Sequence, residues 1–209
     1  MHIGRYEWKE GKKQGATTEN AKKYIDFAAK NNIKGVLIEG WNKGWESWWQ
    51  KECSFNFTKS ANNFNLNEVV NYANLNRVEI IGHHETGGHI GNYEDQLEDA
   101  FKLYHKLGIK YIKTGYAGKI IPEGHFHHGQ YMVNHYRKVL ELAVKYKIMI
   151  DAHEPIKATG LSRTFPNMMT REGARGMEWN AWSEGNTARH TTTLPFTRLI
   201  SGPLDYTPG

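Results

Sequence analysis

Short apolar runs alternate along most of this chain with longer segments whose apolar residues recur at helical spacing. A short apolar run is typical of a buried strand, whereas apolar residues three and four positions apart form one face of a helix. Alternation of the two with short connections predicts a parallel sheet covered by helices. In chain order we expect strands at His2–Trp8, Gly35–Trp41, Val78–Glu85, Ile109–Tyr116, Ile148–Glu154, Ala174–Trp182 and Leu199–Tyr206.

The segments between these runs carry helix signals. We expect a helix at residues 17–32 with Thr18 as its N-cap, because a threonine hydroxyl can accept a bond from the first turn. The segment at residues 92–108 places Leu97, Ala100, Phe101 and Tyr104 on one face, and Gly108 is a typical C-terminal stop. Further helices are expected at residues 66–76 and 130–147.

The expected strands are apolar until they end, and they then end in polar residues. Functional groups at successive strand ends are typical of the catalytic face of a (β/α)₈ barrel. A doubly wound sheet concentrates its site at one switch point, and no glycine-rich dinucleotide or phosphate loop follows the first strand. We therefore predict an α/β fold, a TIM-type barrel with about seven of its eight strands. Residues 1–209 would be one catalytic barrel fragment. The polar ends are Glu39, His83 to Glu85, Lys113, Asp151 with His153 and Glu154, Glu178, and Asp205.

The segment from His84 to His89 comes close to the H-E-x-x-H motif of zinc proteases. In that motif two histidines at i and i+4 share one helix face. Here the second histidine is at i+5, and Gly87 and Gly88 between them disfavour a helix. The protease interpretation therefore fails on geometry.

Several glutamates converge on the predicted strand ends: Glu85, Glu154 and Glu178, with Glu172 on the preceding loop. A pair of such carboxylates can hydrolyse a glycosidic bond, one as acid and one activating water. A cluster of them can instead bind a hard cation such as calcium. A third hypothesis is a zinc-dependent hydrolase of the amidohydrolase type, with His83, His84 and His153 as ligands. Zinc prefers nitrogen and sulfur, so the carboxylate-rich pattern disfavours this hypothesis.

A tryptophan-rich loop, Glu39 to Trp49, follows the second expected strand. Four tryptophans lie within nine residues there, among glycine, asparagine and lysine. Aromatic faces stack well on the apolar faces of sugars, so we expect residues 35–49 to form one wall of the pocket, with Trp41 in contact with substrate.

Charge and composition exclude other classes. The net charge is +5, but lysines are scattered rather than gathered on one stripe, so we predict no nucleic-acid partner. No apolar run approaches 18 residues, so we predict no membrane span, and the first residues lack the apolar core of a signal peptide. Cys53 is the single cysteine, so an intrachain disulfide is excluded.

Five long motifs together resemble the catalytic barrel of glycoside hydrolase family 97. They are GVLIEGWNKGWESWW, IIGHHETGG, YIKTGYAGKIIPEGHFHHGQYMVNHY, IMIDAHEPIKATGLSRTFPNMMTREGARGMEW and HTTTLPFTRLISGPLDYTPG. Within that family the chain is most similar to the inverting, calcium-dependent α-glucosidases of starch utilisation. The resemblance implies an oligosaccharide substrate, Ca²⁺ as cofactor and a periplasmic location. It also implies a longer enzyme, with an N-terminal β-sandwich domain, an eighth strand and a C-terminal region outside this chain.

The resemblance carries roles to individual positions. Glu178 matches the general acid, and Glu85 and Glu154 match the glutamates that activate water. The calcium ligands match Glu154, Glu172 and Glu178, and the substrate-contacting positions match His83, Lys113 and His153.

One position bears on the stereochemistry. Retaining members of the family carry an aspartate nucleophile at the end of the fourth strand, where this chain has Gly115. The resemblance therefore implies an α-glucosidase that inverts the anomeric centre. An inert fragment of such an enzyme is the alternative, because a barrel without its eighth strand has an open edge.

Overall fold

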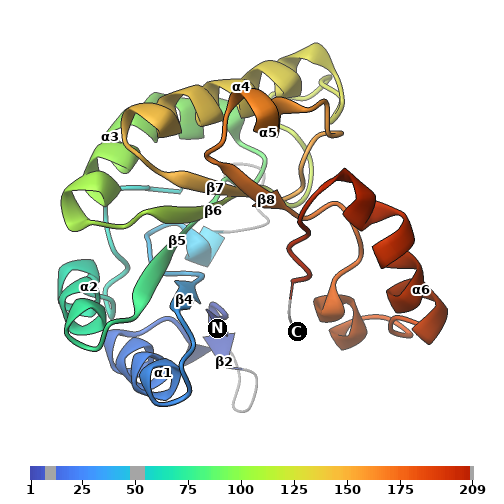
Figure 1. Ribbon diagram of the computed structural model, residues 1–209. Helices are drawn as coiled ribbons and strands as arrows, with labels where there is room; N and C mark the ends of the chain where they lie inside the picture. Colours follow the sequence, from blue (N-terminus) through green and yellow to red (C-terminus); the bar gives the residue numbers. More distant parts are fainter. Residues whose placement is uncertain (8–12, 48–54, 208–209) are drawn as a thin grey trace.

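The computed structural model describes residues 1–7, 13–47 and 55–207. Within them, six strands form one parallel sheet. Every strand pairs only with its neighbours in chain order, as in a (β/α) barrel, whereas the order of a doubly wound sheet reverses at its switch point. Figure 1 shows the sheet curving into an arc, so the predicted fold class, a partial TIM-type barrel, is confirmed. The strands are β1 (His2–Ile3), β4 (Gly35–Ile38), β5 (Glu79–Glu85), β6 (Tyr111–Gly115), β7 (Met149–Ala152) and β8 (Met168–Arg171). A separate antiparallel pair joins β2 (Tyr6–Glu7) to β3 (Lys13–Gln14).

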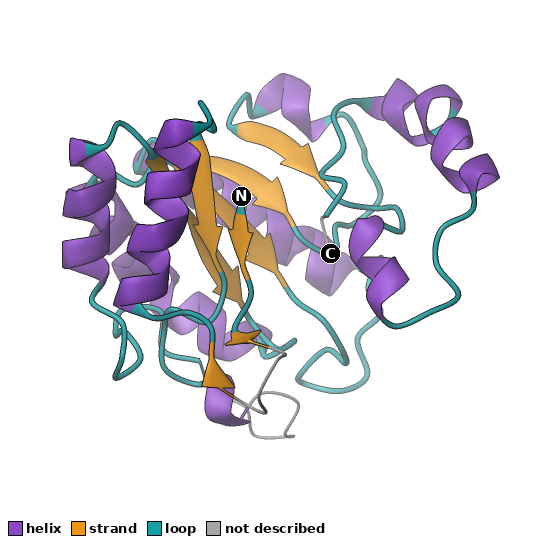
Figure 2. Cartoon of the chain, turned by 90° about the horizontal axis from the view of Figure 1, so that it is seen from below, coloured by secondary structure: helices purple, strands orange, loops and turns teal. Residues whose placement is uncertain are grey.

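Four long helices cover the outer face of the arc, as Figures 1 and 2 show. They are α1 (Thr18–Lys30), α2 (Leu66–Leu75), α3 (Ile90–Leu107) and α4 (Gln130–Lys145). The predicted apolar face of α3 is confirmed, because Leu97, Ala100, Phe101 and Tyr104 are all buried. Among the described helices, none combines the length and the hydropathy that crossing a membrane requires. The shorter helices are η1 (Trp45–Ser47), α5 (Leu161–Thr164), η2 (Met177–Ala181), α6 (Ala188–Thr193), η3 (Leu194–Phe196) and η4 (Arg198–Ser201).

The predicted helix ends are right to within a few residues. Gly108 ends α3 in the left-handed conformation, with φ of 77°, as a C-terminal glycine does. The N-cap of α1 is Thr17, one residue before the predicted Thr18. Both threonines suit a cap, but the hydroxyl of Thr18 is already engaged, because it accepts a bond of 2.8 Å from the backbone N–H of Asn65.

The predicted sixth strand, at residues 174–182, is wrong. Met177–Ala181 form the 3₁₀ helix η2, and the sixth strand of the sheet is β8, which the sequence analysis missed. The aromatic content of residues 174–182 suggested a buried strand, yet Trp179 and Trp182 are exposed and have no sheet to cover. The segment Met168–Arg171 is short and half polar, so its sequence gave no strand signal.

The predicted seventh strand, at residues 199–206, is reduced to a single bridge. Leu204 pairs in parallel with Arg171, and Asp205 N–H donates to the Arg171 carbonyl at 3.0 Å. Arg198–Ser201 form η4 instead of strand. Gly202, with φ of 118°, and Pro203 separate this helix from the bridge, since proline cannot donate to a ladder.

The tightest packing of the sheet against α3 occurs at Gly82 of β5. A Cβ atom placed there would lie 2.2 Å from Cε2 of Tyr104. Tyr104 is itself buried and lies 5.8 Å from Trp41 between ring centroids, so neither ring has room to retreat. Position 82 therefore needs glycine for close approach and not for backbone conformation.

We expect Gly82→Ala to lower the free energy of unfolding by about 1–3 kcal/mol, because overpacking forces the helix away from the sheet. Equilibrium unfolding in urea measures this change. Gly91→Ala is the matched control, because a Cβ there meets nothing within 4 Å, and alanine in a helix is neutral or stabilising. Equal effects of the two substitutions would contradict the packing argument.

Candidate active site

A buried ammonium group lies at the carboxyl edge of the sheet. Lys113, on β6, has its Nζ 2.7 Å from Oδ2 of Asp205, 3.1 Å from Oε1 of Glu172 and 3.0 Å from Oγ1 of Thr207. Its side chain is 8% exposed. These three partners lie 59 to 94 residues further along the chain, so Lys113 joins the centre of the sheet to its last described segment.

The charges around Lys113 determine how the pKa values of Lys113, Asp151 and Asp205 shift. Burial alone would lower the pKa of Lys113, but the charges of Glu172 and Asp205 outweigh it and raise the pKa. Burial raises the pKa of Asp151, and the neighbouring Asp205 raises it further. For Asp205, the charge and hydrogen bond of Lys113 outweigh burial and lower the pKa. Asp151 is therefore the protonated partner of this carboxyl pair and Asp205 the ionised one.

His153 connects two glutamates next to this group. Its Nδ1 lies 3.5 Å from Oε2 of Glu85, and its Nε2 lies 3.4 Å from Oε2 of Glu172. Burial would lower its pKa, but the hydrogen bond and charge of Glu85, followed by the charge of Glu172, raise the pKa to about 9. His153 is thus a cation at neutral pH, held between two anions.

Glu85, at the end of β5, is 3% exposed and has a fixed carboxylate. Its Oε1 accepts bonds from the backbone N–H of Gly87 at 2.8 Å and of Ala117 at 3.2 Å. Gly115 lies opposite Glu85 on β6. A Cβ atom at Gly115 would lie 1.9 Å from the His153 carbonyl oxygen, so the backbone directly after β7 occupies the place of a side chain.

Glu154 has a strained backbone. Its φ is 43°, the left-handed region that non-glycine residues rarely adopt. The hydroxyl of Tyr136, on α4, lies 2.8 Å from the His153 carbonyl and 2.5 Å from the Glu154 carbonyl, and donates to them. Glu154 N–H donates to Oε2 of Glu172 at 3.3 Å. Such strain persists only where the surroundings hold it, and it is frequent at functional sites.

Glu178 lies at the start of η2, above the same edge. Its N–H donates to the Thr207 carbonyl at 3.1 Å, which places it beside the partners of Lys113. The residue is half-buried. Burial raises the pKa of its carboxyl, and the charge of Glu172 raises it further, against the opposing effect of Lys113 and His153. A carboxyl group with a raised pKa can serve as a proton donor.

The predicted histidine triad does not converge. Because side chains alternate along a strand, His84 points to the opposite face from His83 and Glu85. Its ring is fully buried among Phe57, Tyr93, Phe101 and Tyr104, with Nδ1 3.0 Å from the Tyr93 hydroxyl, and burial lowers its pKa to about 3. A zinc site of His83, His84 and His153 is therefore wrong.

Trp41 is not a sugar platform. It is 2% exposed, and its Nε1 donates to the His83 carbonyl at 2.8 Å. Trp45 is 7% exposed and stacks on the ring of His83 at 6.0 Å between centroids. The predicted wall is thus aromatic core beneath His83. Trp48, Trp49 and Cys53 lie outside the described residues.

Comparison with known proteins assigns the family. Residues 1–174 match the model of the family described as glycoside hydrolase 97. The chain belongs to this family. A family 97 enzyme from Pseudoalteromonas sp. strain K8, in complex with acarbose, has 46% identity and a TM-score of 0.89 over the whole chain, which covers 34% of that protein. A retaining alpha-galactosidase of Bacteroides thetaiotaomicron is 30% identical over 93% of the chain. A probable retaining alpha-galactosidase of Streptomyces bingchenggensis is 27% identical over 95% of it.

The family 97 prediction is confirmed, but the prediction of an inverting α-glucosidase is contradicted, because the curated relatives are named as retaining α-galactosidases. That prediction rested on resemblance to the inverting α-glucosidases of the family and on Gly115 in the place of an aspartate. The chain spans 27% and 28% of the length of the two relatives, so most of each relative has no counterpart here.

The predicted calcium ligands Glu154, Glu172 and Glu178 lie around one edge of the sheet, and calcium binding by them stays a prediction. Among the described residues, no group of three or more His, Cys, Asp or Glu side chains is arranged to hold a metal ion. Oε1 of Glu172 accepts from Lys113 and from the Thr207 hydroxyl, and the residue Glu154 is exposed. Lys113 and His153 lie among these carboxylates and supply positive charge there.

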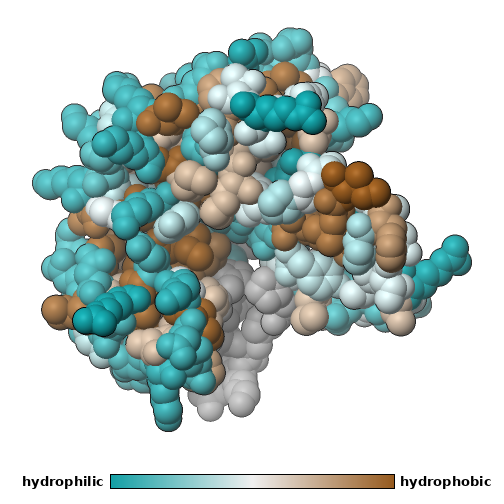
Figure 3. All heavy atoms as spheres, viewed as in Figure 1, coloured by the Kyte–Doolittle hydropathy of each residue, from teal (hydrophilic) through white to brown (hydrophobic). Residues whose placement is uncertain are grey.

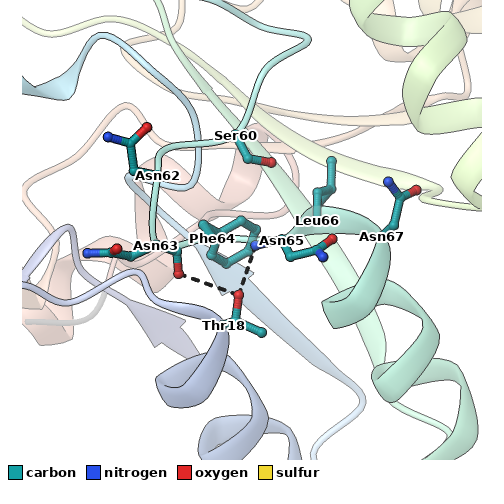
Figure 4. Close-up of a pocket in the computed structure, with 8 residues that line it drawn as sticks. All are labelled: Thr18, Ser60, Asn62, Asn63, Phe64, Asn65, Leu66 and Asn67. Atoms are coloured by element: carbon teal, nitrogen blue, oxygen red, sulfur yellow. Dashed lines mark hydrogen bonds between the residues drawn. The ribbon is translucent and has the colours of Figure 1, made fainter.

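One pocket of about 440 Å³ contains no candidate catalytic residue (Figure 4). It opens where α1 and α2 begin, and amide and hydroxyl side chains dominate its lining. It offers hydrogen bonds but no acid or base. Its lining residues are Thr18, Ser60, Asn62, Asn63, Phe64, Asn65, Leu66 and Asn67.

Sequence reasoning missed three residues that shape the site: Thr207, Tyr136 and the pairing role of Asp205. Asp205 stood out as a polar strand end, but its partner Lys113 is 92 residues away, and spacing carries no signal over that distance. Tyr136 was expected only as part of a helix. Its hydroxyl acts on a neighbouring strand end, which a single sequence does not show.

We expect the imidazole of His153 to titrate near pH 9, and its pKa to fall in Glu85→Gln, which removes the charge that raises it. Two-dimensional NMR of the histidine rings measures this, with His153→Gln to assign the signal. Because the folded pKa lies above the unfolded value of about 6.5, the interaction stabilises the fold fully below that pH. This stabilisation is lost as pH rises from about 6.5 to 9. A His153 pKa that Glu85→Gln leaves unchanged would contradict the assignment.

Proposed function

We propose that this chain carries the catalytic centre of an α-glycosidase, with Glu178 as proton donor. One observation supports this most directly: a half-buried carboxyl with a raised pKa lies at the strand edge that also holds Glu154, Glu172 and two buried cations. The names of the relatives support the α configuration of the substrate. Two are named retaining alpha-galactosidases, and family 97 structures hold acarbose and panose.

Glu178 fits the acid role because its environment favours the protonated form. Burial and the charge of Glu172 both raise its pKa, so the group holds its proton to higher pH than a free glutamate. A sugar that leaves without a proton leaves as an alkoxide, which is a poor leaving group. Proton transfer to its oxygen in the transition state therefore lowers the barrier to bond cleavage. The rate on such substrates should fall as pH rises through this raised pKa.

Glu154 fits the second carboxylate that a glycosidase needs on the other side of the sugar. Its residue is exposed, so the carboxylate is open to water and substrate, whereas that of Glu85 is locked by two backbone N–H groups. Glu85 then holds His153, and the two cations, Lys113 and His153, lower the pKa of Glu172 against the effect of burial.

We expect the chain to hydrolyse 4-nitrophenyl α-galactoside or α-glucoside and neither β-anomer. We also expect Glu178→Gln to lower kcat/KM on the sugar-leaving substrate melibiose or maltose by about 10²–10⁴-fold. The same variant should change little on the matching α-glycosyl fluoride, because fluoride leaves without a proton. Release of nitrophenol measures the rate on the nitrophenyl glycosides, and release of free sugar measures the rate on the disaccharides and fluorides.

Glu184→Gln is the matched control, because Glu184 is an exposed glutamate on the same loop. It should behave as wild type on every substrate. Hydrolysis of β-anomers only, or of none of the four nitrophenyl glycosides, would overturn the proposed activity. An equal loss on fluoride and disaccharide would overturn the acid role of Glu178 alone.

Tyr136→Phe removes one hydroxyl from the strained backbone of Glu154. We expect kcat to fall about tenfold, roughly the 1.4 kcal/mol that misplacing one group costs, with KM less affected. Because the hydroxyl acts through Glu154, it should have no further effect in Glu154→Gln, so the double-mutant cycle is strongly non-additive. Steady-state kinetics of the four proteins tests this.

Tyr146→Phe is the control, because its hydroxyl donates to Glu98 at the far end of α4. It should leave kcat unchanged. Additive effects of Tyr136→Phe and Glu154→Gln would show that Tyr136 acts elsewhere.

A further inference from the structure

Two exposed tryptophans lie directly beside Glu178. Trp179 is 36% exposed and Trp182 is 60% exposed, whereas Trp41 and Trp45 are buried. Their ring centroids lie 6.4 Å apart with the planes 76° to each other. Figure 3 shows that apolar surface gathers on this C-terminal part of the molecule, which also exposes Met177, Phe196, Leu199 and Ile200.

The position of η2 in the barrel places these indoles at the rim of the catalytic face. The helix belongs to the connection that leaves the carboxyl end of β8, and such connections form the active-site face of a barrel. The bond from Glu178 N–H to the Thr207 carbonyl fixes η2 over the end of the next chain segment in the sheet. Trp179 lies within η2, directly after Glu178, and Trp182 is the C-cap residue that ends this helix.

The loop that carries the pair is held in place by its own bonds. Asn186 donates its N–H to Oδ1 of Asn180 at 2.7 Å, and its Nδ2 to the Gly176 carbonyl at 2.7 Å. The Ser183 hydroxyl donates to the Trp179 carbonyl. The Arg175 guanidinium lies 5.7 Å from the Trp179 ring. A fixed aromatic surface binds with little loss of conformational entropy.

We propose that Trp179 and Trp182 form the subsite for the leaving group, and that one of the two nearly perpendicular rings stacks on the apolar face of a departing saccharide while the other lies against its edge. The inference rests on the proposed function of Glu178. A proton donor must lie beside the glycosidic oxygen, so the leaving sugar passes next to position 178. Aromatic rings there supply binding energy that acts only on substrates whose leaving group has a ring to stack. The ligand class is therefore an α-linked saccharide with at least two sugar units.

The test compares leaving groups on one sugar. The substrates are melibiose against α-galactosyl fluoride, and maltose against α-glucosyl fluoride. The variants are Trp179→Ala and Trp182→Ala, with Phe196→Ala as control, because Phe196 is 78% exposed on the same C-terminal segment. Circular dichroism and thermal unfolding verify that each variant folds.

We expect each tryptophan variant to lower kcat/KM on the disaccharide about tenfold and to leave the fluoride rate unchanged, while Phe196→Ala changes neither. Equal rates of wild type and tryptophan variants on the disaccharide would overturn the subsite and leave the proposed function intact. An equal loss on both substrates would assign the pair a structural role instead. Failure of the wild type on both fluorides and both disaccharides would overturn the proposed function, and the subsite with it.

Discussion

The ammonium of Lys113 is the contact on which the candidate site depends. It is buried, and it bonds Glu172, Asp205 and Thr207, which come from the two chain segments that close the described sheet. Removing one partner of a buried ion pair costs about 3–5 kcal/mol, because the other charge remains desolvated. Without this cation, Glu172 and Asp205 would repel each other, and η2 would lose its anchor at Thr207.

The rest of the site follows from this arrangement. Glu172, held by Lys113, accepts the N–H of Glu154 and faces His153, and His153 in turn faces Glu85. Charges of alternating sign thus run from Glu85 through His153 and Glu172 to Lys113. Glu178 lies at the end of this series, half-buried, and burial and the charge of Glu172 raise its pKa.

Sequence patterns predicted the regular half of the molecule well. Val78–Glu85 and residues 92–108 carry strong local periodicity, and they form β5 and α3 nearly as expected. Resemblance to the family predicted that Glu85, Glu154, Glu172 and Glu178 belong to one site. The errors concern residues whose burial the local sequence does not indicate. Trp41 was predicted to contact sugar but lies in the core, and Trp179 was predicted to lie in a strand but is exposed. Residues 168–171 became a strand only because β7 offers them an edge.

The neighbour-by-neighbour order of the sheet has a consequence for how the chain is made. Each strand pairs with the one synthesised just before it, so the arc can extend as residues emerge from the ribosome. The contacts of Lys113 break this rule, because their partners lie 59, 92 and 94 residues later. During synthesis β6 therefore exists before its lysine has a counter-charge. The charged centre therefore assembles after the strands of the described sheet, and a chain interrupted before residue 205 would lack two partners of Lys113.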